Sequence, residues 1–192
     1  MAENNTKLNE GMYVIGGLFI AIAALMFASP SMPSMENDWV SLPLIGVPIL
    51  GSLLLMAFAS VVPSWKKESI SETIRYASLG MSLIVLIITT LMMTDMLMSV
   101  HWANITFNQY VYEVEYEWIS SIGAEWHIGL DGLSMPMVWL TALLVPITII
   151  TTWNEKKPWY YHPLLVFMGG CLIGVFVALD FFMFYVFWEL TL

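Results

Sequence analysis

The stretch at residues 162–192 constrains the fold of this chain more than any other. It is dominated by apolar residues, carries two carboxylates, Asp180 and Glu189, and contains no lysine or arginine. As one straight helix it would be about 45 Å long, whereas the hydrocarbon core of a bilayer is about 30 Å thick. The sequence therefore predicts a complete membrane helix at 162–180, a tight reversal near Asp180, and the beginning of another helix at 181–192.

Composition indicates that the whole chain is a membrane protein. Hydrophobic residues make up 59% of its 192 residues and charged residues 11%, and the mean hydropathy is +0.77. Soluble domains usually contain about 25% charged residues. The net charge of −9 argues against nucleic-acid binding, and the sequence has no phosphate-binding loop, Cys/His metal motif or Ser–His–Asp pattern. Its single cysteine allows no intrachain disulfide. We expect an all-α integral membrane protein, a multi-pass helix bundle.

Five complete apolar spans and the start of a sixth are expected. After a polar N-terminus at 1–10, they are residues 11–28, 40–62, 75–100, 133–153, 162–180 and the truncated 181–192. Residues 64–73 read as a short polar loop. A cleaved signal peptide is the alternative for the first span, but Lys7 lies between Glu3 and Glu10, so no basic region precedes it.

The basic residues agree with this arrangement of spans. All six fall on one side of the membrane: Lys7, Lys66, Lys67, Arg75, Lys156 and Lys157. The acidic connector at 29–38 and the glutamate-rich connection at 101–129 fall on the other side. The positive-inside rule then predicts a cytoplasmic N-terminus and an outer 101–129 connection in the cell membrane.

The long connection at 101–129 contains a stretch with period two. One side carries Tyr110, Tyr112, Val114, Tyr116 and Trp118, and the other carries Glu113, Glu115 and Glu117. This alternation predicts a short β-strand lying on the bundle. The glutamates are most simply a solvated edge, with cation binding as the alternative. Asn104 begins a glycosylation-acceptor pattern, which is too common to weigh much.

Several polar or small residues in the spans have simple structural interpretations. Asp95 lies near the end of its span and is expected to reach the membrane interface. Gly170 and Gly174, with Gly169 beside them, predict close helix packing. Asp180 lies where the chain reverses and is expected to cap the helix that follows, which is a better explanation than a transport role.

Glu189 has no such structural interpretation. It lies about 12 to 14 Å into its helix, near the middle of the membrane, which is too deep for a cap. Its neighbours are bulky and apolar, and no lysine or arginine lies inside a predicted span, since Arg75 only opens the span at 75–100. A carboxylate in this position is a functional hypothesis by default. We expect a proton-relay residue, the alternative being a protonated glutamate hydrogen-bonded to a neighbouring helix.

Three segments carry a resemblance to a known family. In order they are HIGLDGLSMPMVWLTALL at 127–144, GCLIGVFVALD at 170–180 and FFMFYVFWELTL at 181–192. Through them the region 118–192 resembles the N-terminal part of the antiporter-like proton-pumping subunits of complex I. Subunit M of the bacterial enzyme and its mitochondrial fourth-subunit counterpart are the most similar types. The family also includes subunits of archaeal F420H2 dehydrogenases, membrane-bound hydrogenases and Mrp-type antiporters. Residues 1–100 match only as hydrophobic spans, with one span more than the usual pattern.

The resemblance implies a function. Glu189 matches the glutamate of a proton half-channel, whose partner lysine lies on a later helix that this sequence does not include. Asp180, Asp131 and His127 are secondary candidate site residues. Residues 11–192 would be the N-terminal part of an antiporter-like membrane domain in a redox-driven proton translocase. The chain itself would hold no cofactor and do no redox chemistry.

The resemblance also implies partners and leaves alternatives. Flavin and iron–sulfur clusters would belong to peripheral subunits, and the partners would be those subunits, other membrane-arm subunits and lipids. One alternative is a subunit of an Mrp-type cation/proton antiporter, which has the same fold. The other is a structural membrane subunit whose truncated channel is inert.

Overall fold

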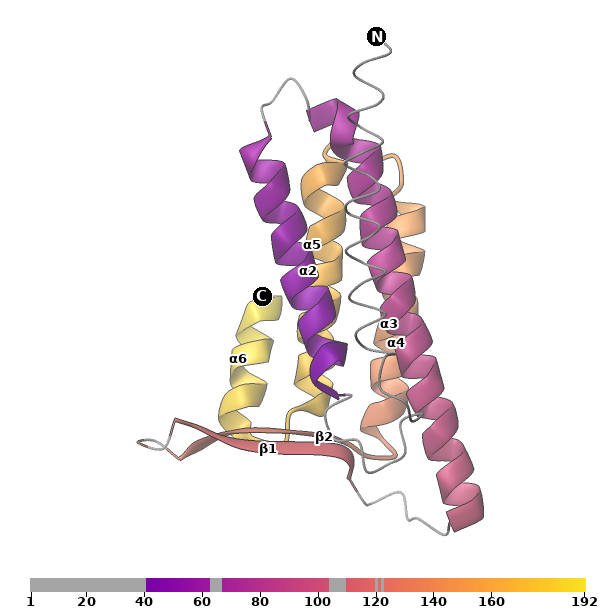
Figure 1. Cartoon of the computed structure of the whole chain (residues 1–192), viewed down its shortest axis with the longest axis vertical. Coiled ribbons are helices and arrows are strands. Elements are labelled where there is room, and N and C mark those ends of the chain that lie inside the picture. Colours follow the sequence, from indigo (N-terminus) through magenta and orange to yellow (C-terminus); the bar gives the residue numbers. More distant parts are fainter. Residues whose placement is uncertain (1–40, 63–66, 104–109, 120, 122) are drawn as a thin grey trace, which may run out of the picture.

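The computed structural model describes residues 41–62, 67–103, 110–119, 121 and 123–192. The expected first span at 11–28, the acidic connector at 29–38 and the Asn104 pattern lie outside these residues. The described elements are α2 (Ser41–Val61), α3 (Lys67–Ala103), β1 (Val111–Ile119), β2 (Ala124–Leu130), α4 (Ser134–Thr151), α5 (Pro158–Val177) and α6 (Phe181–Thr191). Helices α2 to α5 stand side by side, and the two strands form a hairpin across one end (Figure 1). We call this the hairpin end, and the opposite end, where α4 connects to α5 through Lys156 and Lys157, the basic end.

Four of the described helices are long and apolar enough to cross a bilayer. The candidate spans are Pro43–Val61, Ile70–Met98, Ser134–Thr151 and Pro158–Val177. Helix α6 has 11 residues and is shorter than a complete span. The expected class, an all-α membrane bundle, is therefore confirmed for the described part of the chain.

Two helices begin several residues before their expected starts. Helix α3 begins at Lys67, within the predicted polar loop at 64–73. Ile70 and Ile74 lie one turn apart on the same face, and Ile74 is fully buried, so packing extends the helix into this polar sequence. Helix α5 begins at Pro158, before the expected start at residue 162, because proline is favoured in the first turn of a helix.

The long connection forms a two-stranded antiparallel hairpin, where only one strand was expected. Strand β1 confirms the predicted strand, and it pairs with β2 in a register that places Val114 opposite Ile128 and Tyr116 opposite Trp126. The ladder is irregular near the start of β1, where Tyr112 has a positive φ of 56°. Strand β2 lacks the alternation that makes β1 recognisable, so only the pairing with β1 defines it.

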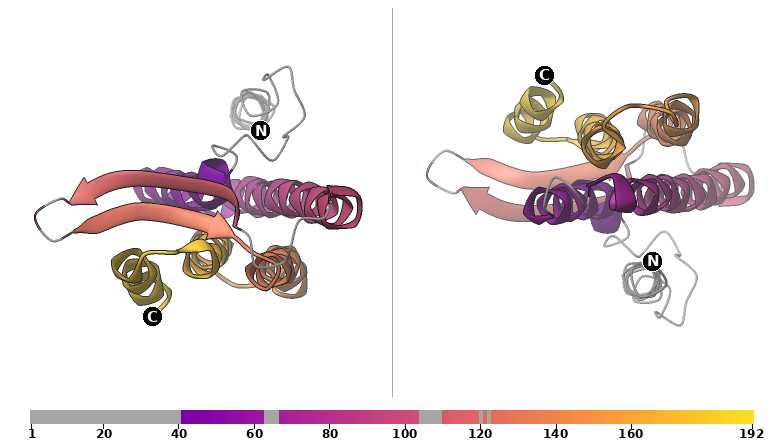
Figure 2. Two further views of the ribbon diagram at one scale, coloured as in Figure 1. Left: turned by 90° about the horizontal axis from the view of Figure 1, so that it is seen from below. Right: turned by 90° about the horizontal axis from the view of Figure 1, so that it is seen from above.

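The predicted two faces of β1 are only partly correct. Its three glutamates are exposed, as expected for a solvated edge, and Tyr112 and Val114 are buried. The remaining aromatic residues of the predicted apolar face are 45% to 60% exposed: Tyr110, Tyr116 and Trp118. For Tyr116 and Trp118, which lie toward the tip of the hairpin, the reason is visible in Figure 2, where that end of the strands extends past the helices that would have to cover it.

Glycines on α5 allow close packing against three other helices. An added Cβ would lie within 3.0 Å of a neighbouring side chain at each position: Gly169 against Val145 of α4, Gly170 against Ile49 of α2, and Gly174 against Phe187 of α6. Real Cβ atoms do not approach so closely, so each glycine is needed for the helix spacing. The predicted packing role of these residues is confirmed, and it makes α5 the centre of the bundle.

Candidate functional site

The site region is α6, which begins with a side-chain cap. Oδ1 of Asp180 accepts a hydrogen bond from the backbone N–H of Met183 at 3.0 Å, and Asp180 has extended backbone geometry. A carboxylate at this position also interacts favourably with the helix dipole. The expected cap at Asp180 is confirmed, and this carboxylate has a structural role at the start of the helix.

The hairpin fixes the residues that lead into α6. The backbone N–H of Leu179 donates to the carbonyl oxygen of His127 at 2.9 Å, and Ala178 forms an isolated antiparallel bridge with Ile128. Gly129 of β2 also packs closely against Leu179. Strand β2 therefore sets where α6 starts.

The packing of Met183 and Phe187 decides which way α6 faces. These side chains are 1% and 5% exposed, respectively, and the Phe187 ring lies against Gly174 of α5. On the other side, the ring of Trp126 meets Phe187 edge-on, with centroids 6.3 Å apart. The two buried residues are four apart, so they define one stripe along the helix. The rotation of α6 follows from this stripe.

Glu189 lies away from the buried stripe. It is two residues after Phe187, which turns it about 200° around a helix with 3.6 residues per turn. It is exposed on the described part of the chain and hydrogen-bonds to Tyr185, one turn earlier on α6. A carboxylate beside a phenol can both accept and release a proton. Its role as a relay in the middle of the membrane stays a prediction.

His127 and Asp131 lie at the hairpin end, His127 next to the residues that precede α6 and Asp131 at the start of α4, and neither contacts Glu189. Nε2 of His127 is 2.7 Å from Oε1 of Glu113 on the paired strand, so one of the three edge glutamates has a specific partner. Sequence reasoning missed this pair because the two residues are 14 positions apart in different strands. The alternation of β1 could have suggested a partner strand, but not which residue of it.

Asp131 holds the turn between β2 and α4. Its Oδ1 accepts from the backbone N–H of Ser134 at 2.6 Å and of Leu133 at 3.0 Å, and the Ser134 hydroxyl accepts from the N–H of Asp131 at 2.8 Å. Partial burial works against ionisation, but the hydrogen bonds from Ser134 and Leu133 outweigh it and lower the pKa of Asp131. The geometry gives this secondary candidate a structural role at the start of α4.

Asp95 was expected only to extend to the membrane interface, but the structure also gives it a hydrogen-bond partner. Its Oδ2 accepts a 2.6 Å hydrogen bond from the hydroxyl of Tyr112, which is 1% exposed. The strand therefore covers this part of α3 and provides a specific donor. Only the tertiary structure brings the two residues together, since the 104–109 segment and the end of α3 separate them along the chain.

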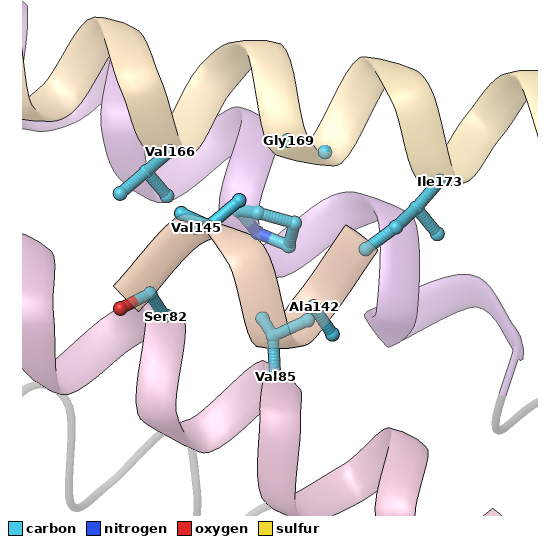
Figure 3. A pocket seen from close by; sticks show the side chains of 9 residues that line it. Ser82, Val85, Ala142, Val145, Val166, Gly169 and Ile173 are labelled. Atoms are coloured by element: carbon cyan, nitrogen blue, oxygen red, sulfur yellow. The ribbon is translucent and has the colours of Figure 1, made fainter. Parts of the chain in front are cut away.

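The described residues contain no metal cluster, and no residue of α6 lines the cavity between the longer helices. No group of three or more His, Cys, Asp or Glu side chains in the described part could hold a metal ion. A small cavity of about 10 Å³ lies between α2, α3, α4 and α5, and Figure 3 shows Val145, Val166 and Ile173 among its lining side chains. It has an apolar lining and about the volume of one water molecule, which excludes an organic cofactor there.

The sequence of this chain is similar to those of F420H2 dehydrogenase and quinone oxidoreductase subunits. The chain is 47% identical over 77 residues to the F420H2 dehydrogenase subunit M of Methanosarcina mazei, covering 39% of this chain and 16% of that protein. It is 32% identical over 156 residues to the NADH-quinone oxidoreductase subunit M of Pseudomonas aeruginosa, covering 75% and 29%. The sequence is homologous to subunit M. It is also 31% identical over 166 residues to an NAD(P)H-quinone oxidoreductase chain 4 of Picosynechococcus, covering 84% and 28%. No protein-family model matches the chain.

The longer alignments extend the resemblance to subunit M beyond the region that suggested it. A match of 166 residues is longer than 118–192, so it includes much of the first 100 residues, which had seemed to match only as hydrophobic spans. The chain spans less than a third of the length of these subunit M and chain 4 relatives.

Proposed function

We propose that this chain is part of a proton-translocating membrane-arm subunit of a complex I-like oxidoreductase. The observation that carries the proposal is the placement of Glu189 on α6. The cap at Asp180 and the packing of Phe187 fix the helix so that this carboxylate faces away from the described bundle. The similarity to oxidoreductase subunits M and chain 4 supports the reaction class.

Glu189 would act through its charge. A carboxylate in an apolar surrounding favours its neutral form, and a cation brought near favours the ionised form. A lysine brought near it in the assembled complex would provide that cation, and changes in the charge of that lysine would load and unload the proton. Tyr185 donates to the carboxylate and would orient it. The chain would couple remote redox chemistry to this step and carry out no redox chemistry itself.

The proposed setting is a large hetero-oligomer in the cell membrane. Lys156 and Lys157 mark the basic end, which by the positive-inside rule would be cytoplasmic, and the acidic hairpin would lie outside. Flavin and iron–sulfur clusters would be held by peripheral partner subunits. Purification of the intact assembly should therefore recover those cofactors with this chain, whereas an assembly that exchanges cations for protons without them would support the antiporter alternative.

The test of the site is Glu189→Gln in the assembled complex. Proton pumping should be abolished or strongly reduced, because glutamine cannot be ionised, while assembly is retained. The measurement is the number of protons moved per electron transferred in reconstituted vesicles. Glu117→Gln, an exposed residue of β1, is the matched control and should leave pumping unchanged. A normal ratio in the Glu189 variant would refute the proposal.

A further inference from the structure

Three buried polar atoms at the basic end have no hydrogen-bond partner among the described residues. They are Nε of Arg75, Oγ of Ser78 and Nδ1 of His162. Ser78 and His162 are both 0% exposed. The one other such atom in the described part, on Trp126, lies at the hairpin end. Buried polar groups are almost always paired with protein or ordered water, so three unpaired atoms at one end of the bundle need a physical explanation.

The three residues lie on two helices that pack together. Arg75 and Ser78 are three apart on α3 and therefore share a face, and α3 contacts α5, which carries His162. Arg75 is close enough to His162 for its charge to act on the imidazole ring. Both also contact Trp153: the guanidinium carbon lies 6.0 Å from its ring centroid and the imidazole centroid 6.4 Å. Arg75 and His162 thus meet at Trp153, between α3, α5 and the end of α4, and Ser78 lies one turn from Arg75 on α3.

The hydrogen bond made by His162 determines what its free nitrogen can do. Nε2 lies 3.2 Å from the carbonyl oxygen of Thr152. A carbonyl can only accept, so Nε2 carries the hydrogen. The carbonyl of Pro158, one turn earlier, also acts on the ring, but Nδ1 makes no hydrogen bond with a described residue and in the neutral ring is left as an acceptor. His162 therefore requires a donor at Nδ1.

The chemistry of the three atoms selects their occupant. Arg75 Nε–H can only donate, His162 Nδ1 accepts, and the hydroxyl of Ser78 can do either. An anion needs donors on every side and would be repelled by the lone pair on Nδ1. A metal ion would be repelled by the guanidinium charge of Arg75. Water both donates and accepts, and a buried water typically makes about three hydrogen bonds.

We propose that Arg75, Ser78 and His162 form a buried water-binding site at the basic end of the bundle. The bound water accepts from Arg75 and donates to Nδ1 of His162, and Ser78 completes its hydrogen bonds. The site links α3 to the start of α5 and fixes the neutral ring of His162. The inference of this water site rests on these contacts alone and does not depend on the proposed proton translocation.

The direct test is electron cryomicroscopy of the whole assembled complex in lipid, at a resolution that shows ordered water. We expect a water peak within hydrogen-bonding distance of Ser78 Oγ and His162 Nδ1. In Ser78→Ala this peak should weaken or disappear, and the melting temperature of the complex should fall. Ser82→Ala is the matched control: Ser82 is 2% exposed on the same helix, but its hydroxyl already donates to the carbonyl oxygen of Leu79. The control should keep the water peak.

Three results would overturn the proposal. One is a side chain from another part of the protein, or an ion, in place of the water. Another is direct contact between α3 and α5 with no water between them. The third is a higher melting temperature for Ser78→Ala, which is expected when a dry, unpaired hydroxyl is removed from a protein interior. If the Ser78→Ala variant does not assemble, the presence or absence of the water peak in the natural complex decides whether the proposal holds.

Discussion

The hydroxyl of Tyr112 donates a 2.6 Å hydrogen bond to Oδ2 of Asp95, joining the hairpin to α3. Burial, followed by the hydrogen bond and the negative charge of Asp95, raises the pKa of Tyr112 above its usual value, so the phenol remains a donor throughout the physiological pH range. Tyr112 also has a positive φ of 56°, a conformation that costs a non-glycine residue free energy. Packing and this hydrogen bond compensate for that cost.

Tyr112→Phe should destabilise the hairpin end. The ring can still pack, but the carboxylate of Asp95 loses a donor in a partly buried position, so the free energy of unfolding should fall by about 1–3 kcal/mol. Thermal unfolding of the purified complex measures the change in stability. The rate of limited proteolysis within the hairpin of the folded complex measures how often the hairpin opens. Tyr116→Phe removes a hydroxyl from a ring that is 60% exposed and should have little effect. Equal effects of the two variants would show that the hydrogen bond contributes nothing.

Gly174→Ala should separate α5 from α6. The added Cβ would lie 2.6 Å from the ring of Phe187, and overpacking of this kind costs about 1–3 kcal/mol. Gly80→Ala is the control, since no atom lies within 4 Å of its added Cβ, and it should be neutral or stabilising. The measurement is the thermal stability of each variant. A Gly174 variant as stable as the control would mean that α6 can shift without cost.

Asp180→Ala should weaken the first turn of α6. Loss of the side-chain hydrogen bond to the N–H of Met183 should cost about 0.5–2 kcal/mol, as for other helix caps. Asp180→Asn keeps an acceptor oxygen and should retain most of the stability. Hydrogen exchange at the amide of Met183 reports the change directly. Faster exchange in both variants alike would indicate that charge at the helix terminus matters more than the cap.

Asp131 should make the stability of the hairpin end depend on acid pH. Its pKa is lowered in the folded state, so its contribution is present above the unfolded pKa and is lost as the pH falls through the folded pKa. Asp131→Asn should be less stable than the natural protein at neutral pH, and the difference should shrink in acid. Glu125→Gln, an exposed residue of β2, is the control. If the difference in stability between Asp131→Asn and the natural protein did not change with pH, the ionised Asp131 carboxylate would not be the source of the stabilisation.

Features that depend on neighbouring residues could be predicted from the sequence. The cap at Asp180 follows from a reversal before an apolar helix, and the strand at β1 follows from its alternation. The partners of Asp95 and Glu113 could not be predicted, because Tyr112 and His127 reach them only through strand pairing and docking. Strand β2 was missed for the same reason: its own residues show no clear period. The helical start of α3 was missed because burial of Ile74 overrides a polar local composition.

The sequence by itself determined that this chain is a bundle of membrane helices with a carboxylate in its last apolar stretch. Lipid cannot form hydrogen bonds with the backbone. A long apolar segment in the membrane therefore folds as a helix, which pairs its own N–H and C=O groups. Only the tertiary structure decided which way that carboxylate faces. Phe187 fits against Gly174, the hairpin fixes the residues before Asp180, and these contacts set the rotation of α6 that leaves Glu189 on its outer surface.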